Sequence, residues 1–281
     1  MAFSRTSPFR LTRVPRAALR ALAALGALCC LASPAQAQGS APVPLSSTPS
    51  RLDEVLQRGT LRVCTTGDYK PYTYLRRDGN FEGIDILLAQ SLAQSLNAKP
   101  VFVKSTWKTL TDDFLAKCDV AVGGVSVTLE RQRRAFFTTA YMVDGKTPIV
   151  RCGDVDKYQT VADINRPSVR VVVNPGGTNE RFARRYFDKA ALRVHPDNVT
   201  IFDQIAEGKA DVMVTDASET LYHHKLDPRL CSVHPEQPFE YSEKAFMVPR
   251  GDVVFQQYVN QWMHLLIKTG GYQAITDQWL K

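Results

Sequence analysis

Apolar residues along the first half of the chain form short β-branched runs that alternate with stretches of helical periodicity. The runs LRVCTT (61–66), VFVK (101–104) and DVAVGG (119–124) are typical of buried strands. A helix is expected around 107–116, and another where apolar residues recur at helical spacing, namely Ile84, Leu87, Leu88, Leu92 and Leu96. This order predicts a βαβαβ unit, whose strands form a parallel sheet with a ligand at their carboxyl ends.

The second half repeats the pattern and predicts a second lobe. The runs VRVVVN (169–174), LRVH (192–195) and DVMVTD (211–216) alternate with expected helices from Thr178 and near 199–207. We therefore expect an α/β protein of two lobes, each with its own sheet, and a ligand cleft between them. The predicted division, with two chain crossings between the lobes, is lobe 1 from 51–143 and 244–281, and lobe 2 from 144–243.

The amino-terminal residues have the composition of a secretory signal peptide. Five arginines precede or enter a short apolar stretch, and Ala35-Gln36-Ala37 follows as a small-residue cleavage site. Residues 1–37 are thus predicted to be removed, and the Pro/Ser-rich stretch 38–50 to be a disordered lead-in. Removing the five arginines lowers the net charge from +7 to +2, which argues against nucleic-acid binding. The expected location is the periplasm, without membrane insertion after cleavage.

Four cysteines remain after the predicted cleavage, and none has the spacing of a zinc site. An oxidising compartment makes disulfides the better interpretation. We expect Cys152 to pair with Cys231, because both flank the middle segment. For Cys64 and Cys118, a disulfide and two buried thiols remain open. The histidines form no metal-like cluster, so no metal is expected, and no cofactor is implied either.

The segment VNPGGTNERFARRYF (172–186) carries the strongest chemical signal. A β-branched run ends in Asn-Pro-Gly-Gly, and an amphipathic helix begins at Thr178. Free N–H groups at such a helix start form an anion site. Glu180, however, places a carboxylate in the first turn, where any bound anion would approach it. An acid there is also common because the helix dipole favours it.

Several blocks occur in the order and spacing of a known family. These are GTLRVCTTGDYKPYTY, VAVGGVSVTLERQRRAFFTTAY, NPGGTNERFA and GKADVMVTDA. Together they resemble the type II periplasmic amino-acid-binding proteins of ABC transporters. VHPDNVTIF (194–202) and HPEQPF (234–239) sharpen the resemblance to the cyclohexadienyl dehydratases, enzymes built on this same fold. Such an enzyme is a carbon-oxygen lyase that converts prephenate to phenylpyruvate and arogenate to phenylalanine.

The resemblance implies a set of binding residues. Arg131 would clamp a carboxylate of the substrate by paired hydrogen bonds, although it could also be one of several cations on a solvated turn. Asp216 ends a strand where relatives hold the ligand ammonium group, while capping of the next helix is the alternative. Thr178 fits both an anion contact and a simple N-cap. The predicted substrate-binding residues are Gly124, Ser126, Arg131, Thr178, Asn179, Asp216, Asp68 and Trp107, the last with core packing as an alternative.

Glu180 is the catalytic residue that the resemblance implies. Its carboxyl group would protonate the ring hydroxyl, which then leaves as water while carbon dioxide departs. The helix dipole favours the ionised form, and we expect burial and the substrate carboxylates to outweigh it and raise the pKa of Glu180.

A transport receptor for a polar amino acid is the alternative function, because its fold and carboxylate clamp would be the same. A sensor domain is a third interpretation. The expected partner is a small carboxylate, prephenate or arogenate. The sequence leaves open which of the two is preferred and whether the chain forms a homo-oligomer.

Overall fold

The computed structural model describes residues 49–281, so the predicted signal peptide and most of the predicted lead-in lie outside the described residues. Ser50, expected at the end of the lead-in, belongs to the folded part. It caps the helix Arg51–Arg58, and its hydroxyl donates to Asp252 Oδ1 (2.8 Å), which fixes its position. No helix within 49–281 combines the length and the apolar character needed to cross a membrane.

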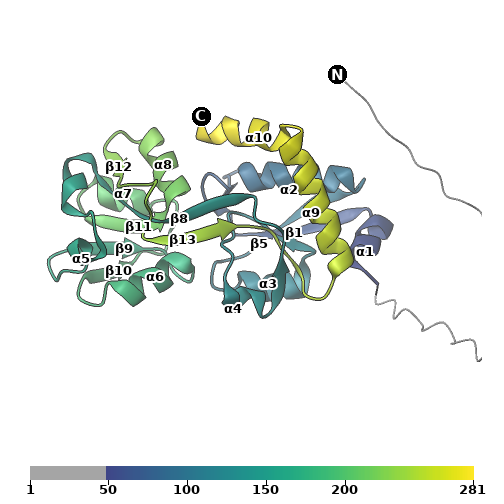
Figure 1. Ribbon diagram of the computed structural model, residues 1–281, viewed down its shortest axis with the longest axis horizontal. Helices are drawn as coiled ribbons and strands as arrows, with labels where there is room; N and C mark the ends of the chain where they lie inside the picture. The colour runs from purple at the N-terminus through teal and green to yellow at the C-terminus, as the bar shows by residue number, and fades with distance from the viewer. Residues whose placement is uncertain (1–48) are drawn as a thin grey trace, which may run out of the picture. The chain divides into compact units, whose positions relative to one another are not determined.

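Lobe 1 contains a five-stranded sheet. Its strands are β1 (Thr60–Thr65), β5 (Lys99–Lys104), β6 (Val120–Ala121), β7 (Ala135–Phe137) and β14 (Met247–Pro249). The order is β5-β1-β6-β14-β7, in which β5, β1 and β6 are parallel and β14 is antiparallel to its neighbours. Strand β14 comes from the end of the chain, so the chain returns to lobe 1 after it has built lobe 2 (Figure 1).

Helices cover both faces of this sheet because its strands are apolar on both sides. The helices are α1 (Arg51–Arg58), α2 (Ile84–Ser95), α3 (Leu110–Lys117), α4 (Leu129–Gln132), α9 (Val253–Lys268) and α10 (Gly271–Leu280). Leu88 and Leu92 of α2 pack with Phe255 of α9 on one face, whereas Leu110 and Phe114 of α3 pack on the other. A small hairpin sheet adds β2 (Asp68–Tyr69), β3 (Thr73–Leu75) and β4 (Phe81–Glu82).

Lobe 2 repeats this arrangement around a second sheet. Its strands are β8 (Met142–Arg151), β9 (Arg170–Val173), β10 (Ala191–Val194), β11 (Val212–Asp216), β12 (Leu230–Ser232) and β13 (Glu240–Lys244). The order is β10-β9-β11-β8-β12, and β13 pairs with β8. The helices are η1 (Cys152–Lys157), α5 (Val161–Ile164), α6 (Thr178–Tyr186), α7 (Ile201–Ala206) and α8 (Ala217–Leu226).

Two paired strands connect the lobes. Strands β8 and β13 are antiparallel, with Lys146 opposite Glu240 and Met142 opposite Lys244. Figure 1 shows both running from one lobe into the other. Each sheet draws its strands from separate parts of the chain, and the residue at which each lobe begins remains a prediction.

The four cysteines of the described region form two disulfides. Cys152 is bonded to Cys231, and Cys64 is bonded to Cys118. The second bond settles, for this structure, the choice that the sequence left open between a disulfide and buried thiols. Each bond lies within one lobe and joins neighbouring elements of that lobe.

Candidate functional site

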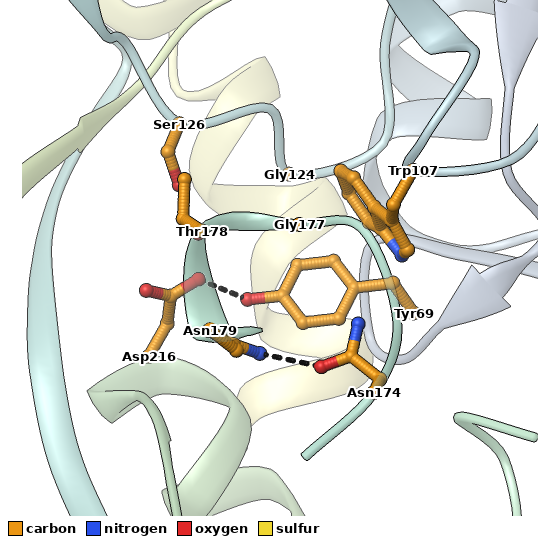
Figure 2. Close-up of a pocket in the computed structure, with 9 residues that line it drawn as sticks. All are labelled: Tyr69, Trp107, Gly124, Ser126, Asn174, Gly177, Thr178, Asn179 and Asp216. Atoms are coloured by element: carbon orange, nitrogen blue, oxygen red, sulfur yellow. Dashed lines mark hydrogen bonds between the residues drawn. The ribbon is translucent and has the colours of Figure 1, made fainter. Parts of the chain in front are cut away.

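A small pocket lies where the two lobes meet, at the carboxyl ends of the strands of both sheets. Figure 2 shows how side chains of both lobes converge on it. The free volume inside is ≈ 10 Å³, which is about what one water molecule needs. A ring-sized ligand therefore enters only when the lobes separate. The lining residues are Tyr69, Trp107, Gly124, Ser126, Asn174, Gly177, Thr178, Asn179 and Asp216.

The lobe 1 wall depends on a turn that follows β6. Gly123 and Gly124 have φ of +117° and +66°, and both donate their N–H groups to Asp85 Oδ2 (2.7 and 2.8 Å). Asp85 belongs to α2 and is fully buried, so it fixes the turn from behind. A Cβ atom on Gly124 would lie 2.5 Å from Tyr69 Cε1. Glycine therefore lets the tyrosine ring reach the pocket.

The lobe 2 wall is the loop before α6. Gly176 has φ of +82° and packs against Lys108, where a Cβ atom would come within 2.9 Å of that residue. Gly177 occupies the N-cap position, and Thr178 is the first residue of the helix. The alternative of a simple N-cap at Thr178 is therefore off by one residue. Its hydroxyl is instead free of the helix and lines the pocket.

Asp216 lies at the centre of a buried charge cluster. Strand pairing places it opposite Lys146, whose Nζ lies 2.6 Å from Asp216 Oδ1. Lys244 Nζ donates to Oδ2 of the same carboxylate, and so does the Tyr69 hydroxyl (2.5 Å). Burial alone would raise the pKa of Asp216, but the two lysine ammonium groups outweigh it and hold the pKa well below its usual range.

Asp216 occupies the N-cap position of α8 without a capping hydrogen bond from its side chain. The capping alternative is therefore wrong for its carboxylate. Whether that carboxylate would hold a ligand ammonium group is a separate matter, because its oxygens already accept bonds from Lys146, Lys244 and Tyr69.

A second carboxyl group, Glu219, lies behind the pocket in the first turn of α8. Its side chain is 1% exposed, and Thr215 Oγ1 donates to its Oε2 (2.5 Å). The Thr215 hydroxyl also accepts from Nδ2 of Asn179, a lining residue (2.8 Å). Burial, and then the negative charge of Asp216, hold the pKa of Glu219 well above its ordinary value. Its protonated form is therefore favoured, and two hydrogen bonds through Thr215 connect it to the pocket lining.

Arg131 lies behind the pocket wall rather than in it. The side chain is buried, and Nη1 donates to the backbone oxygen of Ser126 (2.8 Å). Burial, helped by the nearby charge of Arg181, lowers the pKa of Arg131 to about 10. In this geometry Arg131 supports the Ser126 segment. A direct clamp on a carboxylate stays a proposal that requires the side chain to turn.

Glu180 does not line the pocket in this structure. Oε2 accepts the Gly176 N–H (2.5 Å), and Oε1 accepts from Arg184 Nε (2.8 Å). The Gly176 N–H lowers the pKa of Glu180 by more than burial raises it, and Arg184 lowers it further. Without the substrate carboxylates the pKa lies below its ordinary value, because the side chain folds back onto its own loop and helix, and a rise on substrate binding stays a prediction.

Asp68 and Trp107 line a larger neighbouring cavity of ≈ 570 Å³ between the lobes, and Trp107 is shared with the pocket. The Trp107 ring meets Tyr69 edge-on, with ring centroids 5.4 Å apart. Burial raises the pKa of Asp68. Across the cavity, Asn198 Nδ2 donates to the backbone oxygen of Asp68 (2.9 Å), which joins the lobes. Asp68 thus faces the inter-lobe space but not the small pocket.

One cluster among residues 49–281 has metal-like proximity, namely Cys152, His224 and Cys231. Both sulfur atoms are bonded to each other, so this cluster offers no thiolate.

The prediction from sequence missed the two lysines of the charge cluster and the buried acid behind it. Lys146 lies in the strand-forming run DGKTPIV, and Lys244 begins KAFMVPR. A lysine inside an apolar strand is rarely buried unless it is paired, and this was an available signal. The sequence contained no such signal for Glu219, because acidic residues are common in the first turn of a helix, where Glu219 lies.

Comparisons with known proteins point to one family. The model of the bacterial extracellular solute-binding proteins, family 3, matches residues 61–281. The cyclohexadienyl dehydratase of Pseudomonas aeruginosa is 48% identical over 91% of this chain and 93% of its own. A crystal structure of an ancestral amino acid-binding protein, a precursor of cyclohexadienyl dehydratase, superposes with a TM-score of 0.76 at 35% identity, over 83% of this chain and all of its own.

A crystal structure of an ancestral cyclohexadienyl dehydratase is 53% identical over 83% of this chain and 97% of its own, with a TM-score of 0.53. These similarities confirm the fold class and both resemblances inferred from the sequence.

Proposed function

Since the chain belongs to family 3 of the bacterial extracellular solute-binding proteins, we propose that it is an enzyme on a solute-binding fold. It removes water and carbon dioxide from prephenate to give phenylpyruvate, and acts likewise on arogenate to give phenylalanine. The similarity to a dehydratase over nearly its whole length supports this activity. The predicted signal peptide and the family together support a periplasmic location.

The reaction requires a proton donor at one end of the substrate ring and the release of a bonding electron pair into the ring at the other. The bond between the ring and its carboxylate breaks, and its electron pair enters the ring as carbon dioxide leaves. The carbon–oxygen bond of the ring hydroxyl breaks at the opposite position, and a donated proton turns the leaving group into water. The product ring is aromatic, so no electron-accepting cofactor is needed.

The observation that carries the proposal is a buried carboxylic acid connected to the pocket lining through Thr215. Burial, together with the negative charge of Asp216, raises the pKa of Glu219 and favours its protonated form. A receptor that only binds an amino acid has no use for such a donor. The lining hydroxyl groups of Ser126 and Thr178 would hold the side-chain end of the substrate.

Two glutamates compete for the role of donor. The family resemblance favours Glu180, but its carboxylate is held ionised by Gly176 and Arg184. Glu180 could donate only after a substrate carboxylate displaced both contacts and raised its pKa. The geometry therefore supports Glu219 better, and Glu180 remains the alternative donor.

The test is to incubate the purified mature protein with prephenate at neutral pH, without added metal. The phenylpyruvate that forms is measured by its absorbance in alkali. General acid catalysis contributes about 10²–10⁴-fold, so Glu219→Gln should lower kcat by about 100-fold or more. Glu180→Gln should lower it by about tenfold or less, since it loses a loop contact. The matched control is Glu207→Gln, on the exposed side of lobe 2, which should leave kcat unchanged.

Full turnover by Glu219→Gln together with loss in Glu180→Gln would assign the proton to Glu180. Absence of wild-type turnover, together with strong thermal stabilisation by one amino acid, would show instead that the protein is a receptor.

A further inference from the structure

The charge cluster at Asp216 bears on which substrate the pocket takes. This inference rests on the proposed function and concerns one difference between the two substrates. Prephenate carries a keto group beside its side-chain carboxylate, and arogenate carries an ammonium group at the same position. A keto oxygen only accepts hydrogen bonds, whereas an ammonium group only donates them.

Asp216 is the only acidic side chain among the lining residues, and its acceptor capacity is largely used. Lys146 Nζ lies 2.6 Å from its Oδ1, while Lys244 and Tyr69 both donate to its Oδ2. Both lysines are nearly fully buried, at 3% and 0% exposure. They occupy the place beside the carboxylate that a ligand ammonium group would need, and they repel a third cation there.

The lysines also decide which way the lining hydroxyl groups point. Lys146 donates to Thr178 Oγ1 (3.0 Å), and Lys244 donates to Ser126 Oγ (3.3 Å). An ammonium group is a donor only, so each hydroxyl accepts from its lysine and keeps its own hydrogen for another partner. Both hydroxyl groups line the pocket. The pocket therefore offers them as donors to a ligand.

The side-chain amides of the pocket also present donors rather than acceptors to a ligand. Lys146 donates to Asn179 Oδ1 (2.5 Å), and Asn179 Nδ2 donates to Asn174 Oδ1 (3.1 Å). The side-chain carbonyl oxygens of Asn179 and Asn174 are thus both engaged within the protein, and the amide hydrogens of Asn174 are left for a ligand. The lining presents donors to its contents and has little acceptor capacity left.

We propose that Lys146 and Lys244 are specificity-determining residues, which make the pocket select the 2-keto acid prephenate over the 2-amino acid arogenate. The lysines disfavour the ligand ammonium group and turn the lining hydroxyl groups into donors for a keto oxygen. Arogenate is then the slower of the two substrates.

The experiment compares kcat/KM on prephenate and on arogenate. A site that mismatches one polar group discriminates strongly, so the wild-type ratio should be about tenfold or more in favour of prephenate. Lys146→Met frees Asp216 Oδ1 and removes one cation, and it should lower this ratio by about tenfold. Lys146→Arg keeps the charge and should keep the preference. Lys189→Met, an exposed lysine in lobe 2, is the control for net charge and should leave both values unchanged.

A second measurement does not depend on turnover or on the folding of a variant. Calorimetric titration of the wild-type protein should show that phenylpyruvate binds more tightly than L-phenylalanine. Equal kcat/KM values on the two acids, or faster arogenate turnover, would overturn the inference while leaving the proposed function intact. If neither acid turns over, the proposed function fails, and tighter binding of L-phenylalanine than of phenylpyruvate would then overturn the inference as well.

Discussion

Asp216 is the residue on which the buried charges of the site depend. Its carboxylate is the nearest anion to both lysine ammonium groups. Asp216→Asn would leave two buried cations uncompensated, and breaking a buried ion pair in this way costs about 3–5 kcal/mol. Urea unfolding at neutral pH should show a loss of this size. Asp227→Asn, at an exposed pair with Arg229, should lose less than about 1 kcal/mol. A loss below that limit at Asp216 would show that the lysines are not held by this carboxylate.

The same residue sets a pH dependence. The pKa of Asp216 is depressed in the folded protein, so its stabilising effect is fully present above the unfolded pKa of about 3.9 and is lost as the pH falls below it. The free energy of unfolding should therefore fall more steeply below about pH 4 in the wild type than in Asp216→Asn. Glu219 has the opposite sign: its pKa is raised in the folded protein, so its stabilising effect is fully present below the unfolded pKa of about 4.3 and is lost as the pH rises toward the folded pKa.

For single residues, the sequence predicted which positions line the pocket better than it predicted what their side chains contact. Gly124, Ser126, Thr178, Asn179, Trp107 and Asp216 all line it as expected. Arg131, Asp68 and Glu180 do not, because the direction of a long or folded-back side chain is decided by tertiary partners such as Ser126 O and Gly176 N. The two lysines were missed because their partner comes from a different strand.

The turn after β6 is the element that gives the pocket its shape. Gly124→Ala would place a Cβ atom 2.5 Å from Tyr69 Cε1 and 2.7 Å from Tyr72 Cδ2, at a backbone φ of +66°. We expect a loss of about 1–3 kcal/mol in stability and of about tenfold in kcat/KM, since Tyr69 must move from Asp216. Thermal unfolding and steady-state kinetics measure the two effects.

Gly208→Ala is the matched control for the strained backbone. Its φ is +72°, but a Cβ atom there would meet nothing within 4 Å. This variant should lose stability through backbone strain alone and keep full activity. Equal activity in the two alanine variants would show that Tyr69 need not contact Asp216 for turnover.

Elements were predicted well wherever periodicity is strong. The apolar runs around β1, β9 and β11 follow directly from β-branched residues, and α6 begins at Thr178 as expected. Alternation of such runs with helices was enough for the fold class. The length of β8 could not be read in this way, because Asp144, Gly145 and Lys146 interrupt its apolar pattern with residues that serve the site.

The two disulfides act on the whole molecule through its unfolded state. Cys152 and Cys231 are 79 residues apart, and a loop of that length restricts the unfolded chain considerably. Replacing both by serine should lower the free energy of unfolding by about 2–5 kcal/mol, measured by urea unfolding. Because neither residue lines the pocket, kcat at ambient temperature should stay unchanged. A large loss of kcat without loss of stability would contradict this purely structural role.

The bonds that join the lobes are made by the protein's own side chains. The Tyr69 and Tyr72 hydroxyl groups of lobe 1 reach Asp216 and Ser218 of lobe 2. A transport receptor conveys information by its shape, because its partner must distinguish a loaded molecule from an unloaded one. Here the approach of the lobes depends on two tyrosine side chains as well as on any ligand. The rate at which these bonds open would then limit how quickly product leaves, whatever the speed of the chemical step.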